Sequence, residues 1–320
     1  MIKDSKPLFA ALQKKFFWIL DFGSPPVALL CPIPYPFLMA TIEKAAFGSG
    51  GPPVTRVGLG GEGVLRTWGA DTDARAVIRH ALEMGITYCD CARVYAGSES
   101  YYGSVWAESP EARRRIFQTS KSAGRSRDEV LRDLETSLAT LQAGHLDLWQ
   151  IHDVRTEADL RTIEGPGGAL EGFLESREAG TVRRIGVTGH QDPDILLKAV
   201  RQWPVDSVLL PVNPVEGVMG GFTDRVVPEA RERGMAVIAM KILGAGHYLS
   251  PEGGIDAGLL IRYALSHDIT VAIVGCSTPG EVSQLAEAGI DFTPMAAEEM
   301  GALEDVYRPH VEKLAYYRGR

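Results

Sequence analysis

The 320-residue sequence has few cysteines, and none of them are paired with the C-x2-C spacing that zinc sites and dithiol redox motifs use. They are Cys31, Cys89, Cys91 and Cys276. So small a number does not support a disulfide framework. The scarcity is typical of a protein kept in a reducing compartment, and we therefore expect a cytoplasmic location.

An excess of positive charge is also lacking. The formal net charge is -8, the sequence pI is about 5.5, and no run of Lys and Arg alternates with aromatic residues. A protein that binds nucleic acid usually carries a basic face that attracts phosphates. Nucleic acid is therefore not an expected partner.

No long hydrophobic run is free of interruption. The N-terminus begins with a basic segment, residues 1–15, and the apolar stretches that follow are broken by Asp21 and by five prolines between Pro25 and Pro36. This pattern fits neither a membrane span nor the apolar region of a signal peptide, although a cleaved export signal stays an alternative. We predict a poorly structured N-terminal extension over residues 1–48, a domain over residues 49–320, and no membrane partner.

What the sequence does contain is a regular alternation of apolar strands and amphipathic helices, without an internal Gly/Ser linker. One helix is expected after Ser126, where Glu129 completes the spacing of a capping box. The pattern predicts a single α/β domain, a (β/α)8 TIM barrel with an additional C-terminal helix over 296–314. The eight candidate strands are 54–61, 87–92, 116–121, 146–153, 182–190, 207–214, 236–243 and 271–276.

One of these strands sets an aspartate between two cysteines, in T-Y-C-D-C-A. Side chains alternate across a strand, so Asp90 points to one side while Cys89 and Cys91 point to the other. The three cannot bind one metal ion. If Asp90 faces the barrel interior, both cysteines pack beneath the helices as small apolar residues.

In this kind of barrel the reactive residues lie at the carboxyl ends of the strands. Asp90, Tyr95, Lys121 and His152 come from the ends of three consecutive predicted strands. A buried Lys paired with an Asp can lower the pKa of a neighbouring tyrosine, which then exchanges a proton with a carbonyl oxygen. Each residue also has an ordinary structural interpretation, but their joint placement favours a catalytic site.

The same residues carry a resemblance to a known family. D-C-A-R-V-Y-A-G-S-E-S-Y-Y-G (90–103), F-Q-T-S-K ending at Lys121, and H-L-D-L-W-Q-I-H ending at His152 resemble the motifs of the aldo-keto reductase family, over about residues 54–289. The resemblance implies an NAD(P)-dependent oxidoreductase that reduces a small aldehyde or ketone, or oxidises the alcohol. It implies Tyr95 as the general acid or base and no metal.

The cofactor expectation also rests on the resemblance, since no G-x-G-x-x-G motif opens a helix. It implies NADP(H) across the barrel mouth, and NAD(H) stays open because Glu281 stands where the family commonly has a basic residue. Met240 also fits plain core packing and Thr278 a helix cap. The implied cofactor-binding positions are Gly61, Thr188, Met240, Lys241, Gly275, Cys276, Ser277, Thr278 and Glu281.

Two other functions stay open from the sequence. The first is a metal-dependent barrel hydrolase with Asp90, His152, Asp153 and His190 as ligands. The second is a redox-sensing protein that binds the nucleotide and turns over slowly. The substrate and the oligomeric state are not predicted. Six residues could line or rim a substrate pocket, and each fits packing beneath a loop equally well: Leu65, Arg66, Trp68, Trp149, His190 and Tyr248.

Overall fold

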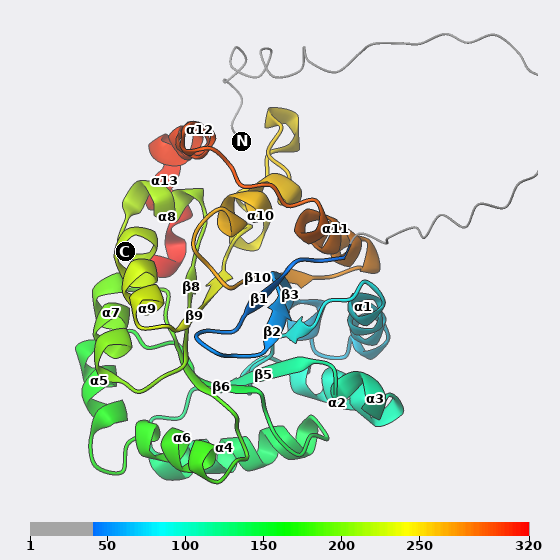
Figure 1. Cartoon of the computed structure of the whole chain (residues 1–320), viewed down its shortest axis with the longest axis vertical. Helices are drawn as coiled ribbons and strands as arrows, with labels where there is room; N and C mark the ends of the chain where they lie inside the picture. The colour runs from blue at the N-terminus through cyan, green and yellow to red at the C-terminus, as the bar shows by residue number, and fades with distance from the viewer. Residues whose placement is uncertain (1–40, 320) are drawn as a thin grey trace, which may run out of the picture.

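Eight parallel strands close into a barrel in the computed structural model, which describes residues 41–319 (Figure 1). Strands that follow one another in sequence are neighbours in the barrel, and the last pairs with the first. The predicted TIM barrel is therefore confirmed. Its strands are β3 (Val57–Gly63), β4 (Tyr88–Cys89), β5 (Phe117–Ser122), β6 (Leu148–Ile151), β7 (Ile185–Thr188), β8 (Ser207–Pro211), β9 (Ala236–Met240) and β10 (Val271–Cys276).

Helices surround this barrel on the outside (Figure 1). The capping box predicted at Ser126 is present, with the Ser126 N–H donating to Glu129 Oε2 over 3.0 Å. Within residues 41–319, no helix combines the length and the apolar character needed to cross a membrane. The helices are α1 (Asp71–Glu83), α2 (Ser98–Glu108), α3 (Pro110–Arg113), α4 (Arg127–Thr140), α5 (Glu157–Glu164), α6 (Ala169–Glu178), α7 (Pro193–Gln202), α8 (Pro214–Met219), α9 (Val227–Glu232), α10 (Ala257–Leu265), α11 (Pro279–Ile290), α12 (Ala297–Tyr307) and α13 (Val311–Leu314).

The additional C-terminal helix is present in a different form from the one expected. The predicted stretch 296–314 divides into α12 and α13, with a short 3-10 turn, Arg308–His310, between them. Pro309 lies in this turn, and a proline has no N–H to continue the hydrogen bonds of an α-helix. The helix is therefore interrupted where the sequence places the proline.

A short hairpin of β1 (Lys44–Ala46) and β2 (Pro53–Thr55) precedes the barrel. Ile42 and Phe47 are buried, and the Phe47 ring lies 4.5 Å from the ring of Phe117 inside the barrel. Residues 41–48 are thus ordered, whereas the sequence analysis assigned them to the extension, because these two side chains pack on the barrel core. The rest of the predicted extension, residues 1–40, lies outside the described residues.

The barrel strands alternate between an inner and an outer core as expected. Tyr88 and Phe117 belong to the inner core, with stacked rings 5.5 Å apart. Cys89 and Cys91 belong to the outer core under the helices, and burial raises the pKa of the Cys89 thiol to about 12. The interpretation of both cysteines as packing residues is confirmed, and Asp90 is left on the inner side at the barrel mouth.

Candidate active site

Asp90 and Lys121 form a buried ion pair at the ends of β4 and β5. Lys121 Nζ lies 2.6 Å from Asp90 Oδ2 and donates a second hydrogen bond, of 2.8 Å, to the Cys91 carbonyl. The other carboxylate oxygen accepts from the Thr119 hydroxyl over 2.9 Å. Burial alone lowers the pKa of Lys121, but the charge and hydrogen bond of Asp90 raise it above its ordinary value. The lysine is therefore a fixed cation.

Tyr95 lies beside this cation. The centre of its ring is 4.9 Å from Lys121 Nζ and 4.8 Å from the Arg66 guanidinium carbon. On another side is Gly61 of β3, where an added Cβ would lie 2.8 Å from a carbon of the Tyr95 ring. Gly61 was expected to contact the cofactor. In the structure it lies against the Tyr95 ring, and only glycine leaves room for that ring.

The pKa of Tyr95 differs in direction from the expectation. Burial raises the pKa of the phenol, and the positive charge of Lys121 lowers it by less, so that the net shift is upward. The neighbouring charge alone predicts a lowered pKa for Tyr95, but removal of the phenol from water, which the sequence does not show, has the larger effect. The high pKa keeps the phenol protonated at neutral pH, which is the form that donates a proton.

His152 completes the group at the end of β6. Its ring centre is 5.7 Å from that of Tyr95, and the two rings are nearly perpendicular at 79°. Burial and the charge of Lys121 lower the pKa of His152 to about 3, so the imidazole is neutral near pH 7. Its Nδ1 atom is buried and has no hydrogen-bond partner among the described residues. His152 is therefore a neutral polar group beside the Tyr95 phenol.

The low pKa of His152 predicts a contribution to the pH dependence of stability. Between about pH 6.5 and 3, His152 binds a proton in the unfolded chain but not in the folded chain. Its contribution to the free energy of unfolding therefore becomes less favourable to the folded state as the pH falls. At pH 5 we expect wild type to lose about 2 kcal/mol more than His152→Gln, relative to pH 7.5. Urea unfolding of both proteins at the two pH values measures this, and equal losses would contradict the prediction.

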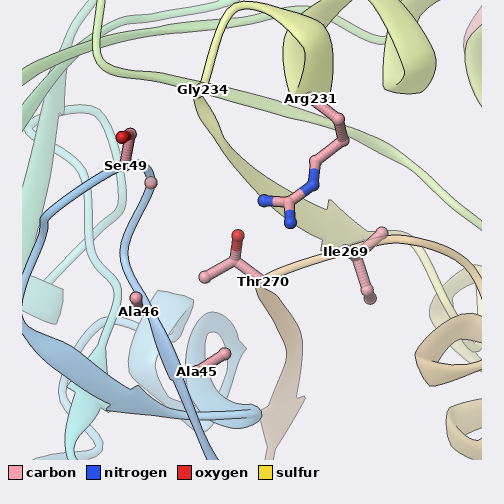
Figure 2. Close-up of a pocket in the computed structure, with 8 residues that line it drawn as sticks. Ala45, Ala46, Ser49, Arg231, Gly234, Ile269 and Thr270 are labelled. Carbon is pink, nitrogen blue, oxygen red and sulfur yellow. The ribbon is translucent and has the colours of Figure 1, made fainter.

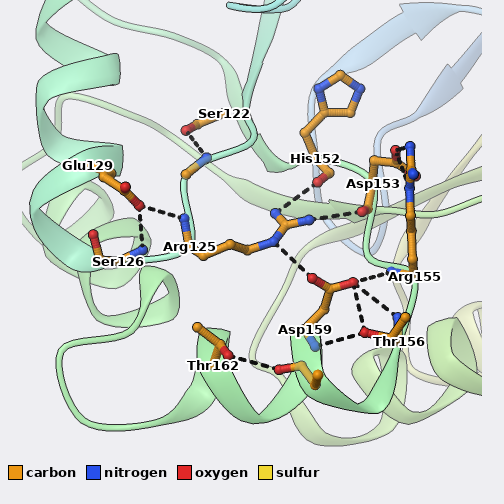
Figure 3. A network of polar contacts seen from close by, with 12 residues as sticks. Ser122, Arg125, Ser126, Glu129, His152, Asp153, Arg155, Thr156, Asp159 and Thr162 are labelled. Carbon is orange, nitrogen blue, oxygen red and sulfur yellow. Dashed lines mark hydrogen bonds and ion pairs between the residues drawn. The ribbon is translucent and has the colours of Figure 1, made fainter.

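Arg125 fixes the backbone at the end of β6 (Figure 3). Its guanidinium donates to the carbonyls of His152 and Asp153, over 3.0 and 2.9 Å, and forms an ion pair of 3.3 Å with Asp159 of α5. Asp153 has a φ of +59°, and its N–H donates to the Thr188 hydroxyl over 2.8 Å. Arg125 was missed in the sequence because nothing in the pattern shows which carbonyls an arginine reaches.

The proposed metal ligands do not come together. Asp90 is bound to Lys121, whereas Asp153 is bound to Arg155 over 2.8 Å and lies 3.2 Å from His190 Nε2. Among residues 41–319, no group of three or more His, Cys, Asp and Glu side chains is arranged to hold a metal ion. Of the four side chains of the hydrolase alternative, Asp90 is thus in one ion-pair cluster and Asp153 and His190 are in another, whereas His152 is in neither.

Lys241 at the end of β9 faces the C-terminal residues of the chain. Its Nζ lies 5.3 Å from the centre of the Tyr317 ring, and burial lowers its pKa, against the opposing charges of Glu62 and Asp153. Tyr317 also accepts a hydrogen bond of 3.1 Å from Asn213 at the end of β8. Tyr317 was missed in the sequence, because nothing local links a residue at the chain end to these strands. Met240 lies against the inner core, as its packing interpretation expected.

The start of α11, where a phosphate was expected to bind, holds a carboxylate of the chain itself. The Ser277 N–H donates to Glu281 Oε2 over 2.6 Å, and Thr278 caps the helix by accepting from the Glu281 N–H over 3.3 Å. Cys276 is buried, and Gly275 lies so close to β3 that an added Cβ would be 2.6 Å from the Glu62 backbone. At this helix end, therefore, the Glu281 carboxylate accepts the backbone N–H of Ser277, one of the groups that could otherwise contact a phosphate.

Three of the six residues suggested for a substrate pocket lie in the core instead. Leu65 is buried, Trp149 stacks on Phe173, and Tyr248 donates a hydrogen bond to the Leu314 carbonyl. Trp149 faces the helices because it alternates with the inward residues of β6. The other three lie outside the core: Arg66 over the Tyr95 ring at the barrel mouth, His190 beside Asp153, and Trp68, 81% exposed, in the loop after β3.

A cavity at the other end of the barrel is separate from this site (Figure 2). It has a volume of about 290 Å³ and is lined by residues of β1 and by residues that precede β9 and β10. The amino ends of parallel strands lie opposite the face that bears Asp90, Lys121 and His152. The cavity is therefore not part of the site that contains Tyr95. Its lining residues include Ala45, Ala46, Ser49, Arg231, Gly234, Ile269 and Thr270.

Comparison with known proteins agrees with this geometry. L-galactose dehydrogenase of Arabidopsis thaliana is 24% identical over 321 residues, which cover 88% of this chain and 99% of that protein. Pyridoxal 4-dehydrogenase of Microbacterium luteolum is 26% identical over 66% of this chain and 74% of its own length. An aldo/keto reductase of Klebsiella pneumoniae, solved with NADP and acetate, has the same fold, with a TM-score of 0.67, 23% identity and coverage of 83% of this chain and 96% of that one.

The family model described as the aldo/keto reductase family matches residues 56–254, which is more than half of the chain and includes every strand from β3 to β9. Asp90, Tyr95, Lys121 and His152 all lie within the matched region, at the mouth of the barrel. Fold, site geometry and sequence match therefore agree, and the chain belongs to the aldo/keto reductase family.

Proposed function

We propose that this oxidoreductase reduces a small aldehyde or ketone, or oxidises the corresponding alcohol, with Tyr95 as the general acid or base. The observation that carries the proposal is the contact of a half-buried, protonated phenol with the fixed Lys121–Asp90 ion pair and a neutral imidazole at one barrel mouth. When bound, the nicotinamide nucleotide supplies or accepts the hydride. The protein residues then handle the proton and the orientation of the carbonyl.

In this proposal each residue has a distinct part. Tyr95 donates its proton to the carbonyl oxygen, and the adjacent Lys121 stabilises the phenolate that forms. Asp90 holds the lysine in place through the 2.6 Å contact. His152, neutral because its pKa is about 3, donates a hydrogen bond to the same oxygen and orients it. No residue of this set has to change its charge before the substrate binds.

The test is a fluorescence titration of the protein with NADPH and with NADH, followed by the decrease in nucleotide absorbance with a panel of carbonyl compounds. Relatives are named for L-galactose and pyridoxal, so the reverse reaction is assayed with an aldose and with pyridoxal. Turnover with either nucleotide supports the proposal. Binding without turnover would favour the redox-sensing alternative, and no binding would contradict both.

Glu281 is expected to influence the choice between the two nucleotides. The K. pneumoniae relative was solved with NADP, which favours NADP(H), whereas the Glu281 carboxylate at the start of α11 opposes a 2′-phosphate and leaves NAD(H) open. We expect Glu281→Arg to raise the ratio of kcat/KM with NADPH to that with NADH by about 5- to 10-fold. Steady-state kinetics with both nucleotides measure the ratio.

The control for this variant is Glu287→Arg, which makes the same charge change later in α11, away from the helix start. It is expected to leave the nucleotide ratio unchanged. If Glu281→Arg left the ratio of kcat/KM with NADPH to that with NADH unchanged, the 2′-phosphate of NADPH would not reach this helix end.

A further inference from the structure

Strand β5, which carries Lys121, is polar on both faces. Its inward residues include Thr119 and Lys121 of the active site, and its outward residues Gln118, Ser120 and Ser122 are fully buried under the helices. The outward residues of the next strand, β6, are apolar and belong to the outer core. Buried polar side chains destabilise a fold unless they are hydrogen-bonded, so the outer face of β5 requires specific partners.

Each of the three outward side chains has a partner on a helix. Gln118 accepts from the indole N–H of Trp106 over 3.1 Å, and the Ser122 hydroxyl donates to Asp133 of α4 over 2.5 Å. Between them, the Ser120 hydroxyl donates to Glu99 Oε1 over 2.6 Å. Glu99 and Trp106 both belong to α2, the helix that follows the loop bearing Tyr95. The contacts of Gln118 and Ser120 therefore join the outer face of β5 to the helix that follows the Tyr95 loop.

Glu99 is an unusual residue in this position. It is 3% exposed, and burial raises the pKa of its carboxyl group, although Ser120, Ser137 and Arg93 act in the opposite direction. Its second oxygen lies 3.7 Å from the Arg93 guanidinium and makes no hydrogen bond within the described part of the chain. Glutamate is rarely buried without a specific partner, so the contact with Ser120 is the main polar link of this side chain.

The loop between β4 and α2 is compact and is held at both ends. The Arg93 N–H donates to the Lys121 carbonyl over 3.0 Å, and the Tyr95 N–H donates to the Ala92 carbonyl over 3.0 Å. At the other end, the Ser98 hydroxyl contacts the carbonyls of Ala92 and Tyr95. Glu99 is the next residue along the chain, so its contact with Ser120 fixes the far end of this loop on β5.

We propose that Glu99 is a positioning residue, which holds the Tyr95 phenol beside Lys121 by fixing the start of α2 to Ser120. In the sequence, Ser120 lies between Thr119 and Lys121. These two residues each donate a hydrogen bond to a different carboxylate oxygen of Asp90. One hydrogen bond thus sets the position of the proton donor relative to both members of the ion pair. The inference rests on the proposed function, in which Tyr95 donates the proton.

The test compares Glu99→Ala with Asp133→Ala. Asp133 makes the same kind of carboxylate–serine contact on the same strand face, but from α4, and its contact with the Tyr95 loop is a longer one, of 4.0 Å to Arg93. We expect Glu99→Ala to lower kcat about 10-fold without changing nucleotide affinity. In the plot of kcat against pH, the limb that reports ionisation of the Tyr95 phenol should move to higher pH, because Lys121 moves away from the phenol. Asp133→Ala is expected to leave kcat and that limb unchanged.

A conservative variant separates the hydrogen bond from general destabilisation. Glu99→Gln keeps an oxygen that accepts from Ser120, so it should restore most of kcat. A Glu99→Gln variant as slow as Glu99→Ala would overturn the proposal, and so would an equal loss of kcat in Asp133→Ala or an unchanged kcat in Glu99→Ala.

Crystal structures provide a measurement that does not depend on activity. In Glu99→Ala we expect the separation of Lys121 Nζ from the Tyr95 ring to exceed the 4.9 Å of the unaltered chain, with no such change in Asp133→Ala. If the wild type reduces no carbonyl but this separation still grows, the proposed function fails and the positioning role stands. An unchanged separation overturns the positioning role whatever the activity.

Discussion

Replacing Tyr95 with phenylalanine is expected to lower kcat for carbonyl reduction by about 10²- to 10⁴-fold, the usual contribution of a positioned general acid. The substitution removes only the hydroxyl, and the phenyl ring keeps its contacts with Lys121, Arg66 and Gly61. The geometry of the mouth should therefore persist. Nucleotide affinity, measured by fluorescence titration, should change by less than about 2-fold, since the hydroxyl acts in the proton transfer and not in binding the nucleotide.

Tyr102→Phe is the matched control for this experiment. Tyr102 is fully buried in α2, where its ring stacks on Trp106 at 5.7 Å, away from the barrel mouth. Its loss of a hydroxyl should leave kcat unchanged. A Tyr95→Phe variant that retains kcat within a few-fold of wild type would remove Tyr95 from the mechanism, and a neighbouring donor such as His152 would then have to supply the proton.

The alternation of strands made part of this site predictable from the sequence. Asp90, Lys121 and His152 all lie at strand ends, where side-chain direction follows from a period of two, and the structure brings them to one mouth. The same period places Trp149 on the outer face, opposite to Gln150 and His152, so alternation alone favours its packing interpretation over a place at a substrate pocket. Tyr95 follows its strand in a loop, where alternation does not fix the direction of a side chain, so its place just beyond the strand end and the motif resemblance indicated it together.

Contacts between distant segments were not predictable. Tyr317 reaches Lys241 and Asn213 only because α12 and α13 bring the end of the chain back to the mouth. The direction of the Tyr95 pKa shift depends on burial, which a sequence does not give, and burial outweighs the lysine charge. The role inferred for Glu99 likewise depends on the polar outer face of β5. Alternation predicts that this face packs under the helices, where apolar residues are expected, and it does not show which helix residue is the partner of Ser120.

The buried Asp90–Lys121 pair predicts the largest change in stability. Lys121→Met removes the cation and leaves the Asp90 carboxylate, 2% exposed, without its charged partner. Breaking a buried pair in this way costs about 3–5 kcal/mol, because an uncompensated charge stays in the interior. We expect a loss of that size in the free energy of unfolding, measured by urea denaturation, together with loss of turnover.

The double variant Asp90→Asn/Lys121→Met tests the cause. Removing both charges leaves no uncompensated ion, so stability should recover towards wild type while activity stays lost. Arg127→Met provides the comparison for an ordinary pair: Arg127 contacts Glu175 over 2.6 Å, but the two side chains are 39% and 49% exposed, and the loss should stay below about 1 kcal/mol. If Lys121→Met were as stable as Arg127→Met, the Asp90 carboxylate would have to be neutral or hydrated in the folded protein. Asp90 would then not be the group that keeps Lys121 protonated, and a group other than this ion pair would have to stabilise the Tyr95 phenolate.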